Sequence, residues 1–236
     1  MFGFKAVQAD SSLDSDHDKV SDQDEILVYH TDPQNADTDN DGFTDGDELK
    51  NGYSPYDGKK ALRLEDGDAD KDGLSDRMEL NFRSNPVAVD TDGDGFGDNE
   101  EVKNGFDPTK PNEKLAKRIE VNLAKQELAY FLGSVRLGTS TVSTGRPSMP
   151  TPKGTFKIAN KNRRAWSKSY GLWMPYWMGI SGGRVGFHEL PEWPNGYKEG
   201  ANHLGKPVSH GCIRLGVGPA EKLYKWAEVG TAVIIY

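Results

Sequence analysis

The sequence predicts two unlike domains, an acidic domain of repeated loops with short helices and then a mainly β domain with one or two short helices. Residues 1–111 hold 29 acidic and 11 basic side chains, a formal charge of −18, whereas the rest carries +10 and all five tryptophans. Four copies of one acidic pattern occupy the first half, and short apolar-polar alternations recur in the second. We therefore expect a tail at 1–13, repeats at 14–111, a linker at 112–116 and a second domain at 117–236.

The four acidic copies are twelve residues long, with carboxylates at positions 1, 3, 5, 9 and 12. Calcium loops take ligands from positions 1, 3, 5 and 12, a backbone carbonyl from position 7 and often a water at position 9, with glycine at position 6 for the turn. The pattern therefore predicts structural Ca²⁺ sites. Their candidate ligands are Asp14, Asp16, Asp18, Asp22 and Glu25; Asp37, Asp39, Asp41, Asp45 and Glu48; Asp68, Asp70, Asp72, Asp76 and Glu79; and Asp90, Asp92, Asp94, Asp98 and Glu101.

The spacing of the copies predicts two pairs of loops, because their starts are separated by 23, 31 and 22 residues. Short helical turns ended by glycine, at Gly52 and Gly105, are expected after the loops. The first copy carries Lys19 in place of the position-6 glycine, so it is expected to be the weakest site or empty. The alternative is an acidic, solvated and disordered linker.

The alternation of apolar and polar residues in the second domain predicts mostly antiparallel strands. Lys125 and Gln126 separate two alternating segments and indicate a hairpin, and the aromatic-rich stretch 160–200 suits either a core or the wall of a groove. The expected elements are strands at 118–123, 128–132, 154–159 and 231–236, one strand or two at 135–137 and 141–145, and a helix at 219–227.

Cys212 is the only cysteine, so the chain has no intramolecular disulfide. It follows His210 by two residues in a glycine-rich stretch, and residues i and i+2 of a strand share one face. A thiol beside an imidazole is a candidate nucleophile with its base. The alternative is a small buried hydrophobe beside a structural histidine.

Two resemblances extend this interpretation. The repeats resemble bacterial thrombospondin type 3 repeats or dockerin-like loop-helix units. Residues 117–236 resemble the L,D-transpeptidase catalytic domain, and ordered motifs carry the likeness: Thr144-Gly, Thr151-Pro-Lys-Gly-Thr-Phe, Met174-Pro-Tyr, Gly186-Phe-His188, the stretch from Leu204 to Leu215, and the stretch from Gly230 to Ile235.

The resemblance implies a β sandwich or barrel in which Cys212 is the nucleophile and His188, rather than His210, is the base. It implies oxyanion or substrate contacts from Ser209, His210, Gly211 and Arg214, where Arg214 either pairs with a substrate carboxylate or braces the turn. Glu189 stands where the family often has glycine, and the 20 residues between His188 and Ser209 make a slightly long gap.

The implied function is peptidoglycan L,D-transpeptidation, in which a tetrapeptide stem acylates the cysteine and an amine acceptor takes the acyl group. The alternatives are an L,D-carboxypeptidase, a non-catalytic calcium-dependent wall-binding protein, and a cysteine peptidase of another fold. We expect Ca²⁺ as the only cofactor, with none for catalysis, stem peptides as partners, and no nucleic acid. The repeats point to an extracytoplasmic location; no transmembrane run is present, and Met1–Ala9 is too short for a signal sequence.

Overall fold

The computed structural model describes residues 13–236, and the chain divides into two compact units, residues 1–114 and 115–236. The stretch Met1–Ala9, which was considered as a signal sequence, lies outside the described residues. None of the helices that the structure describes has the length and apolar character needed to cross a bilayer.

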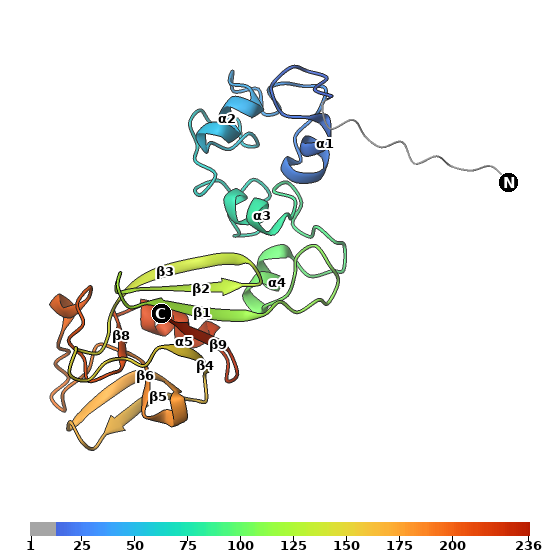
Figure 1. Cartoon of the computed structure of the whole chain (residues 1–236). Helices are drawn as coiled ribbons and strands as arrows, with labels where there is room; N and C mark the ends of the chain where they lie inside the picture. Colours follow the sequence, from blue (N-terminus) through green and yellow to red (C-terminus); the bar gives the residue numbers. More distant parts are fainter. Residues whose placement is uncertain (1–12) are drawn as a thin grey trace. The chain divides into compact units, whose positions relative to one another are not determined.

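In the repeat unit, a short helix begins at position 9 of each loop (Figure 1). Gly52 and Gly105 end two of these helices with positive φ angles of 79° and 87°, as predicted, because a left-handed residue suits glycine. The first loop differs in that its single turn continues as a π-helix. The helices are α1 (Asp22–Asp24), η1 (Glu25–Tyr29), α2 (Asp45–Asn51), α3 (Asp76–Phe82) and α4 (Asp98–Asn104).

The interior of the repeat unit is largely acidic. Among the described residues, its buried aliphatic and aromatic side chains are few, and they are Val20, Leu64, Leu74, Phe82 and Val102. Buried carboxylates outnumber them, and Glu25, Asp45, Asp76, Glu79 and Asp98 are fully enclosed. Burying a charge is unfavourable unless it is paired or bound to a metal. The interior of this unit therefore depends on how its enclosed carboxylates are compensated.

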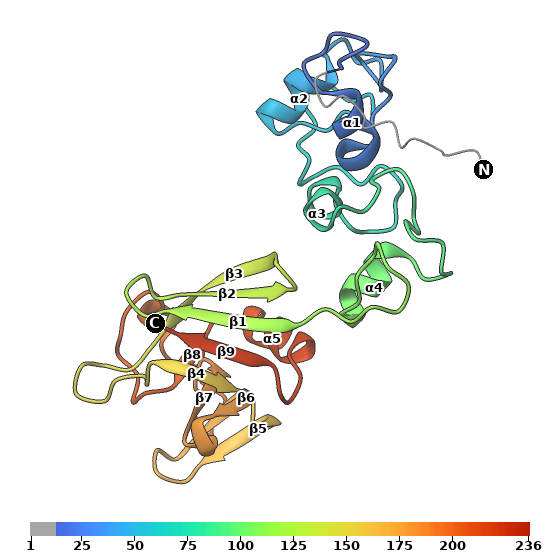
Figure 2. The same ribbon diagram turned by 45° about the vertical axis from the view of Figure 1, so that its right-hand side comes forward.

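The second unit is built on one nine-stranded sheet with the order β4-β9-β1-β2-β3-β8-β7-β6-β5 (Figure 2). β1 and β9 are parallel, as are β7 and β8, and the other pairs are antiparallel. The strands are β1 (Lys117–Asn122), β2 (Glu127–Leu132), β3 (Val135–Ser143), β4 (Gly154–Lys157), β5 (Asn160–Ser167), β6 (Leu172–Ile180), β7 (Val185–Glu189), β8 (Ile213–Leu215) and β9 (Ala232–Ile235). The helices are η2 (Ser181–Gly183), η3 (Ala201–His203) and α5 (Pro219–Trp226).

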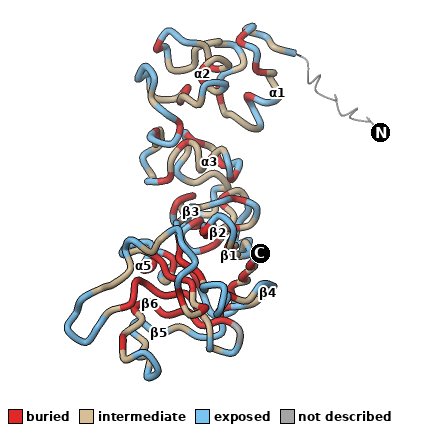
Figure 3. The backbone as a smooth tube through the Cα atoms, turned by 60° about the vertical axis from the view of Figure 1, so that its left-hand side comes forward, coloured by how far each residue is buried: buried red, intermediate tan, exposed pale blue. Residues whose placement is uncertain are grey.

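A single hydrophobic cluster joins the two halves of this sheet. It combines Ile119 and Val233 from one half with Met178 and Phe187 from the other, and Leu223 of α5 packs among them. Figure 3 shows the buried residues concentrated along these strands. The sheet therefore curls around one core, and the predicted mainly β class is confirmed.

Two details make the sequence prediction more specific. The segments 135–137 and 141–145, expected as one strand or two, lie largely in the single strand β3, which pairs with β2 and, through Val142 and Ser143, with β8. The aromatic-rich stretch contributes to both core and groove: Trp177 is buried, whereas Trp166 and Tyr170 are exposed. The alternation of apolar and polar residues cannot tell core aromatics from groove aromatics here, because β6 is largely buried on both of its faces.

Candidate active site and candidate calcium loops

Cys212 lies in a tight turn immediately before β8. Ser209 is fully buried there; its Oγ donates to the Cys212 carbonyl oxygen at 2.6 Å and accepts from the Gly211 N–H at 3.1 Å. Gly211 has a φ of +110°, a conformation that L side chains rarely adopt. Ser209 and Gly211 therefore shape the turn that presents the cysteine.

Thr151 holds the same turn from a distant part of the chain. Its Oγ1 donates to the Gly211 carbonyl at 2.8 Å and accepts from the Gly145 N–H at 2.8 Å. A Cβ on Gly145 would lie 2.3 Å from the Met149 carbonyl oxygen, so only glycine fits. Residue-by-residue reasoning did not select Thr151 as functional; its place in an ordered motif was the available signal.

His188 comes from β7, which runs parallel to β8. The register pairs His188 with Arg214, and Cys212 precedes Arg214 by two residues. Since side chains two apart share a face, His188, Arg214 and Cys212 lie on one side of the sheet. All three line one cavity of about 800 Å³, together with Ser209 and His210.

The His188 ring is fixed in one tautomer. Its Nδ1 lies 2.5 Å from the Glu189 carbonyl oxygen, which can only accept, so Nδ1 carries the proton and Nε2 keeps its lone pair. The ring also stacks on Trp177, with centroids 6.2 Å apart. The orienting partner that sequence reasoning left open is thus a backbone oxygen of the next residue.

Burial sets the protonation of both groups. It lowers the pKa of His188 to about 4, with the positive charge of Arg214 adding to the effect, and it raises the pKa of the Cys212 thiol. At neutral pH the histidine and the cysteine are therefore both uncharged. The cavity is therefore lined by a neutral imidazole and a neutral thiol instead of an ion pair.

His210 lies in the cavity wall. Its ring stacks on Tyr170 with centroids 4.6 Å apart, and burial lowers its pKa. Both histidines stack on an aromatic ring. His188 differs in that it is buried and its Nδ1 is hydrogen-bonded to a backbone carbonyl. His203, in η3, does not line this cavity.

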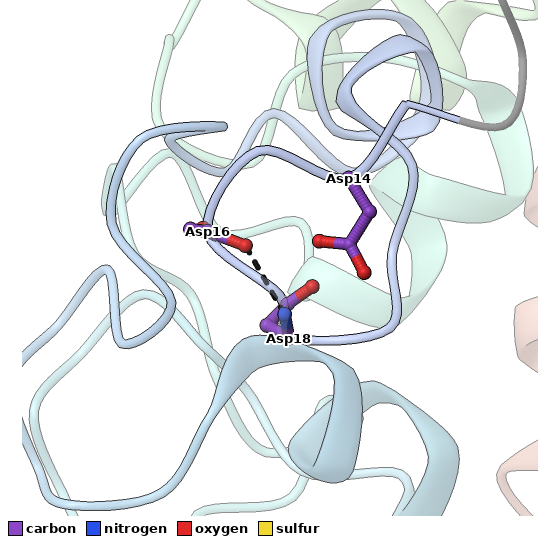
Figure 4. Close-up of side chains that lie close together, drawn as sticks. All are labelled: Asp14, Asp16 and Asp18. Carbon is purple, nitrogen blue, oxygen red and sulfur yellow. Dashed lines mark hydrogen bonds between the residues drawn. The ribbon is translucent and has the colours of Figure 1, made fainter.

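In the repeat unit, the carboxylates at positions 1, 3 and 5 of each loop converge. One oxygen from each of Asp14, Asp16 and Asp18 lies within 4.8 Å of the others, and the other loops repeat the arrangement. Figure 4 shows these three side chains of the first loop. The other groups are Asp37, Asp39 and Asp41; Asp68, Asp70 and Asp72; and Asp90, Asp92 and Asp94.

The position-12 glutamates give an independent sign of a missing partner. Both carboxylate oxygens of Glu48 and of Glu79 are buried without a hydrogen-bond partner, as is one oxygen of Glu25 and of Glu101. Burial and the nearby aspartates raise the pKa of Glu48 to about 8 and of Glu79 to about 9. Oxygen ligands of this kind suit a hard divalent cation.

The position-9 aspartates have another role in the loops. Asp45 accepts from the Thr38 N–H and hydroxyl at 2.9 and 2.6 Å, and Asp98 accepts from Thr91 in the same way. Asp22 accepts likewise from Ser15, and Asp76 accepts from Ala69 and Ser54. These carboxylates close the loop and lie outside the three-oxygen clusters, as a water-mediated position 9 would.

Hydrogen bonds join the loops in pairs. Asp18 of the first loop accepts from the Gly46 N–H at 2.7 Å, and Asp72 of the third accepts from the Asn99 N–H at 2.8 Å. Lys19 has a φ of +85°, and its ammonium pairs with Asp47 of the second loop at 2.8 Å. The charge that set the first loop apart thus has a partner in its neighbour.

The site thus belongs to a mainly β domain in which a cysteine and an oriented histidine line one cavity, and comparison with known proteins identifies the family. The L,D-transpeptidase catalytic domain matches residues 116–235, and the bacterial TSP3 repeat matches residues 37–52 and 90–111. The chain belongs to the L,D-transpeptidase catalytic domain family and carries bacterial TSP3 repeats before that domain, so both resemblances are confirmed.

Individual relatives are similar to this chain over part of their length. YciB of Bacillus subtilis (strain 168), a protein assigned as an L,D-transpeptidase, is 33% identical over 125 residues, which is 50% of this chain and 64% of that protein. An L,D-transpeptidase structure from Stackebrandtia nassauensis is 29% identical, with a TM-score of 0.44, covering 51% of this chain and 55% of that one. The LdtMt1 transpeptidase in complex with imipenem is 23% identical, with a TM-score of 0.47, covering 52% and 60%.

Proposed function

We propose that this protein is a peptidoglycan L,D-transpeptidase that forms an acyl-enzyme on Cys212. The observation that carries the proposal is the placement of the thiol and the His188 ring on one face of adjacent strands, lining one cavity, with the tautomer of the ring fixed by Glu189. A partly buried thiol needs a base of this kind to act as a nucleophile, because burial raises its pKa and it does not ionise at neutral pH.

In the first step, His188 Nε2 takes the proton of Cys212 as the sulfur attacks the carbonyl carbon of the bond before the terminal D-residue. The imidazolium then gives that proton to the departing amine, and a thioester remains. In the second step, an acceptor amine attacks the thioester while His188 takes its proton, and the thiol is restored as the new amide forms. Water in place of the amine gives the carboxypeptidase reaction.

Backbone N–H groups of the turn are proposed to bind the oxyanion. The Gly211 N–H is engaged by Ser209 Oγ, so the role falls to His210 and Cys212. Arg214 is proposed to meet a substrate carboxylate: its side chain lines the cavity, and its Nε is buried without a partner. Bracing of the turn is assigned to Ser209 and Thr151 instead.

The loops are proposed to bind Ca²⁺ through the twenty acids of the repeats, with the acids at positions 1, 3, 5 and 12 as direct ligands. Bound calcium supplies positive charge that neutralises and crosslinks buried carboxylates, so its binding energy is folding energy. The high calcium concentration outside cells suits such sites and supports an extracytoplasmic location.

Incubation with a synthetic tetrapeptide stem and an amine acceptor tests the reaction. We expect release of the terminal D-residue and a product whose mass equals the acylated acceptor; a product of hydrolysis alone would assign the protein as a carboxypeptidase. The Cys212→Ala variant should release nothing. Turnover by that variant, or none by the wild type with Ca²⁺ present, would contradict the proposal.

A further inference from the structure

The cavity around Cys212 contains two charged side chains of opposite sign that lack an ionic partner. Among the residues the structure describes, neither Arg214 nor Glu199 takes part in any ion pair. Arg214 is only 9% exposed, and its buried Nε has no hydrogen-bond partner. An unpaired buried guanidinium is unfavourable, which points to a ligand that completes it.

Glu199 is the only carboxylate among the described residues that line this cavity. Trp193 Nε1 donates to its Oε2 at 2.9 Å, and the Glu199 N–H donates to the Pro191 carbonyl at 3.0 Å. Glu192 forms backbone bridges with Trp173 of β6 and with Lys198, so a short hairpin attached to the sheet carries Glu199. The carboxylate is therefore fixed in place, with one oxygen held by Trp193.

Arg214 and Glu199 interact electrostatically but form no ion pair with each other. Desolvation lowers the pKa of Arg214, and the negative charge of Glu199 opposes that shift. The third charged residue of the cavity, Arg184, is exposed. The cavity thus offers one positive and one negative group across a space that a small ligand can fill.

We propose that Arg214 and Glu199 together bind a zwitterionic α-amino acid centre of the substrate, with its carboxylate on Arg214 and its ammonium on Glu199. This inference rests on the proposed function. It assigns Glu199 as a specificity-determining residue that selects stems whose third side chain ends in such a centre. Neutralising either charge of the ligand leaves one protein charge unpaired, which is why selection is strong.

Three synthetic tetrapeptide stems test the pair. The third residue of each is a diamino dicarboxylic acid, whose far centre is free in the first, amidated at the carboxylate in the second and acetylated at the amine in the third. Affinities are measured by calorimetry on the Cys212→Ala protein, where no reaction occurs, and acylation rates are measured on the wild type. We expect amidation and acetylation each to weaken binding about tenfold or more.

In Glu199→Gln, acetylation of the stem should no longer weaken binding, whereas amidation should still weaken it. Arg214→Gln should show the reverse. These losses of affinity are called the acetylation and amidation penalties. Glu221→Gln, which removes a carboxylate of α5 outside the cavity, serves as the matched control and should keep both penalties. Equal affinity for the three stems, or an acetylation penalty that survives Glu199→Gln, would overturn the pair. If the wild type bound the stems selectively without acylation, the proposed function would fail and the pair would stand.

Discussion

Removal of calcium should unfold the repeat unit. A ligand at a hundred times its Kd adds about 2.7 kcal/mol of stability per site, so three occupied loops add about 8 kcal/mol, comparable to the whole stability of a domain. The few apolar side chains buried in the unit cannot replace that amount. We expect a chelator to remove the helical circular-dichroism signal of the repeats at pH 7.5 and Ca²⁺ to restore it.

The pH dependence of the chelated protein provides an internal check. The metal-free fold binds more protons than the unfolded chain, because the pKa of Glu79 is raised from 4.5 to about 9 and that of Glu48 to about 8. Stability without calcium should therefore fall as pH rises from about 4.5 to about 9 and recover toward pH 5.

Glu79→Gln should lower calcium affinity. Glu65→Gln, which changes an exposed acid outside the loops, should not. A melting curve of the repeat unit that is unchanged by the chelator would refute the calcium assignment.

Loss of the His188 ring should slow acylation of Cys212 by about 10² to 10⁴. His188→Ala removes the imidazole that the Glu189 carbonyl orients, and the thiol that remains is uncharged because burial raises its pKa. The rate constant for acylation by a carbapenem, followed by stopped-flow absorbance, measures the effect. In the wild type it should stay level from about pH 5 to pH 8, because the pKa of His188 is lowered to about 4.

Variants of the other histidines decide between the two candidate bases. His210→Phe retains a ring to stack on Tyr170 and retains the backbone N–H, so it should cost less than about tenfold. His203→Ala should have no effect, since His203 lies outside the cavity. A loss with His210→Phe that matches the loss with His188→Ala would return the role of base to His210.

The sequence predicted what depends on local pattern. The converging carboxylates could be found because their spacing is a property of twelve consecutive residues, and the hairpin between β1 and β2 because apolar and polar residues alternate on both sides of its turn. His188 was reached only through the family motif, since nothing nearby in sequence links it to Cys212. The parallel pairing of β7 with β8 supplies that link in space.

Contacts between distant segments were beyond sequence reasoning. Thr151 reaches Gly211 across 60 residues, and Trp193 holds Glu199 in a hairpin whose attachment to β6 leaves no periodic signal. The position-9 aspartates matched the ligand pattern, although hydrogen bonds within the loop occupy them. Glu189 was noted as a departure from the family, and the structure pairs its buried carboxylate with Lys198 of the longer segment that follows.

The measurement that tests the central claim most directly is the intact mass of the calcium-loaded protein after exposure to a carbapenem, with the adduct located by peptide mapping. We expect a single added acyl fragment on Cys212 in the wild type and no adduct on the Cys212→Ala protein, which should melt at the same temperature. An unmodified wild type, or an adduct that persists when Cys212 is replaced, would contradict it.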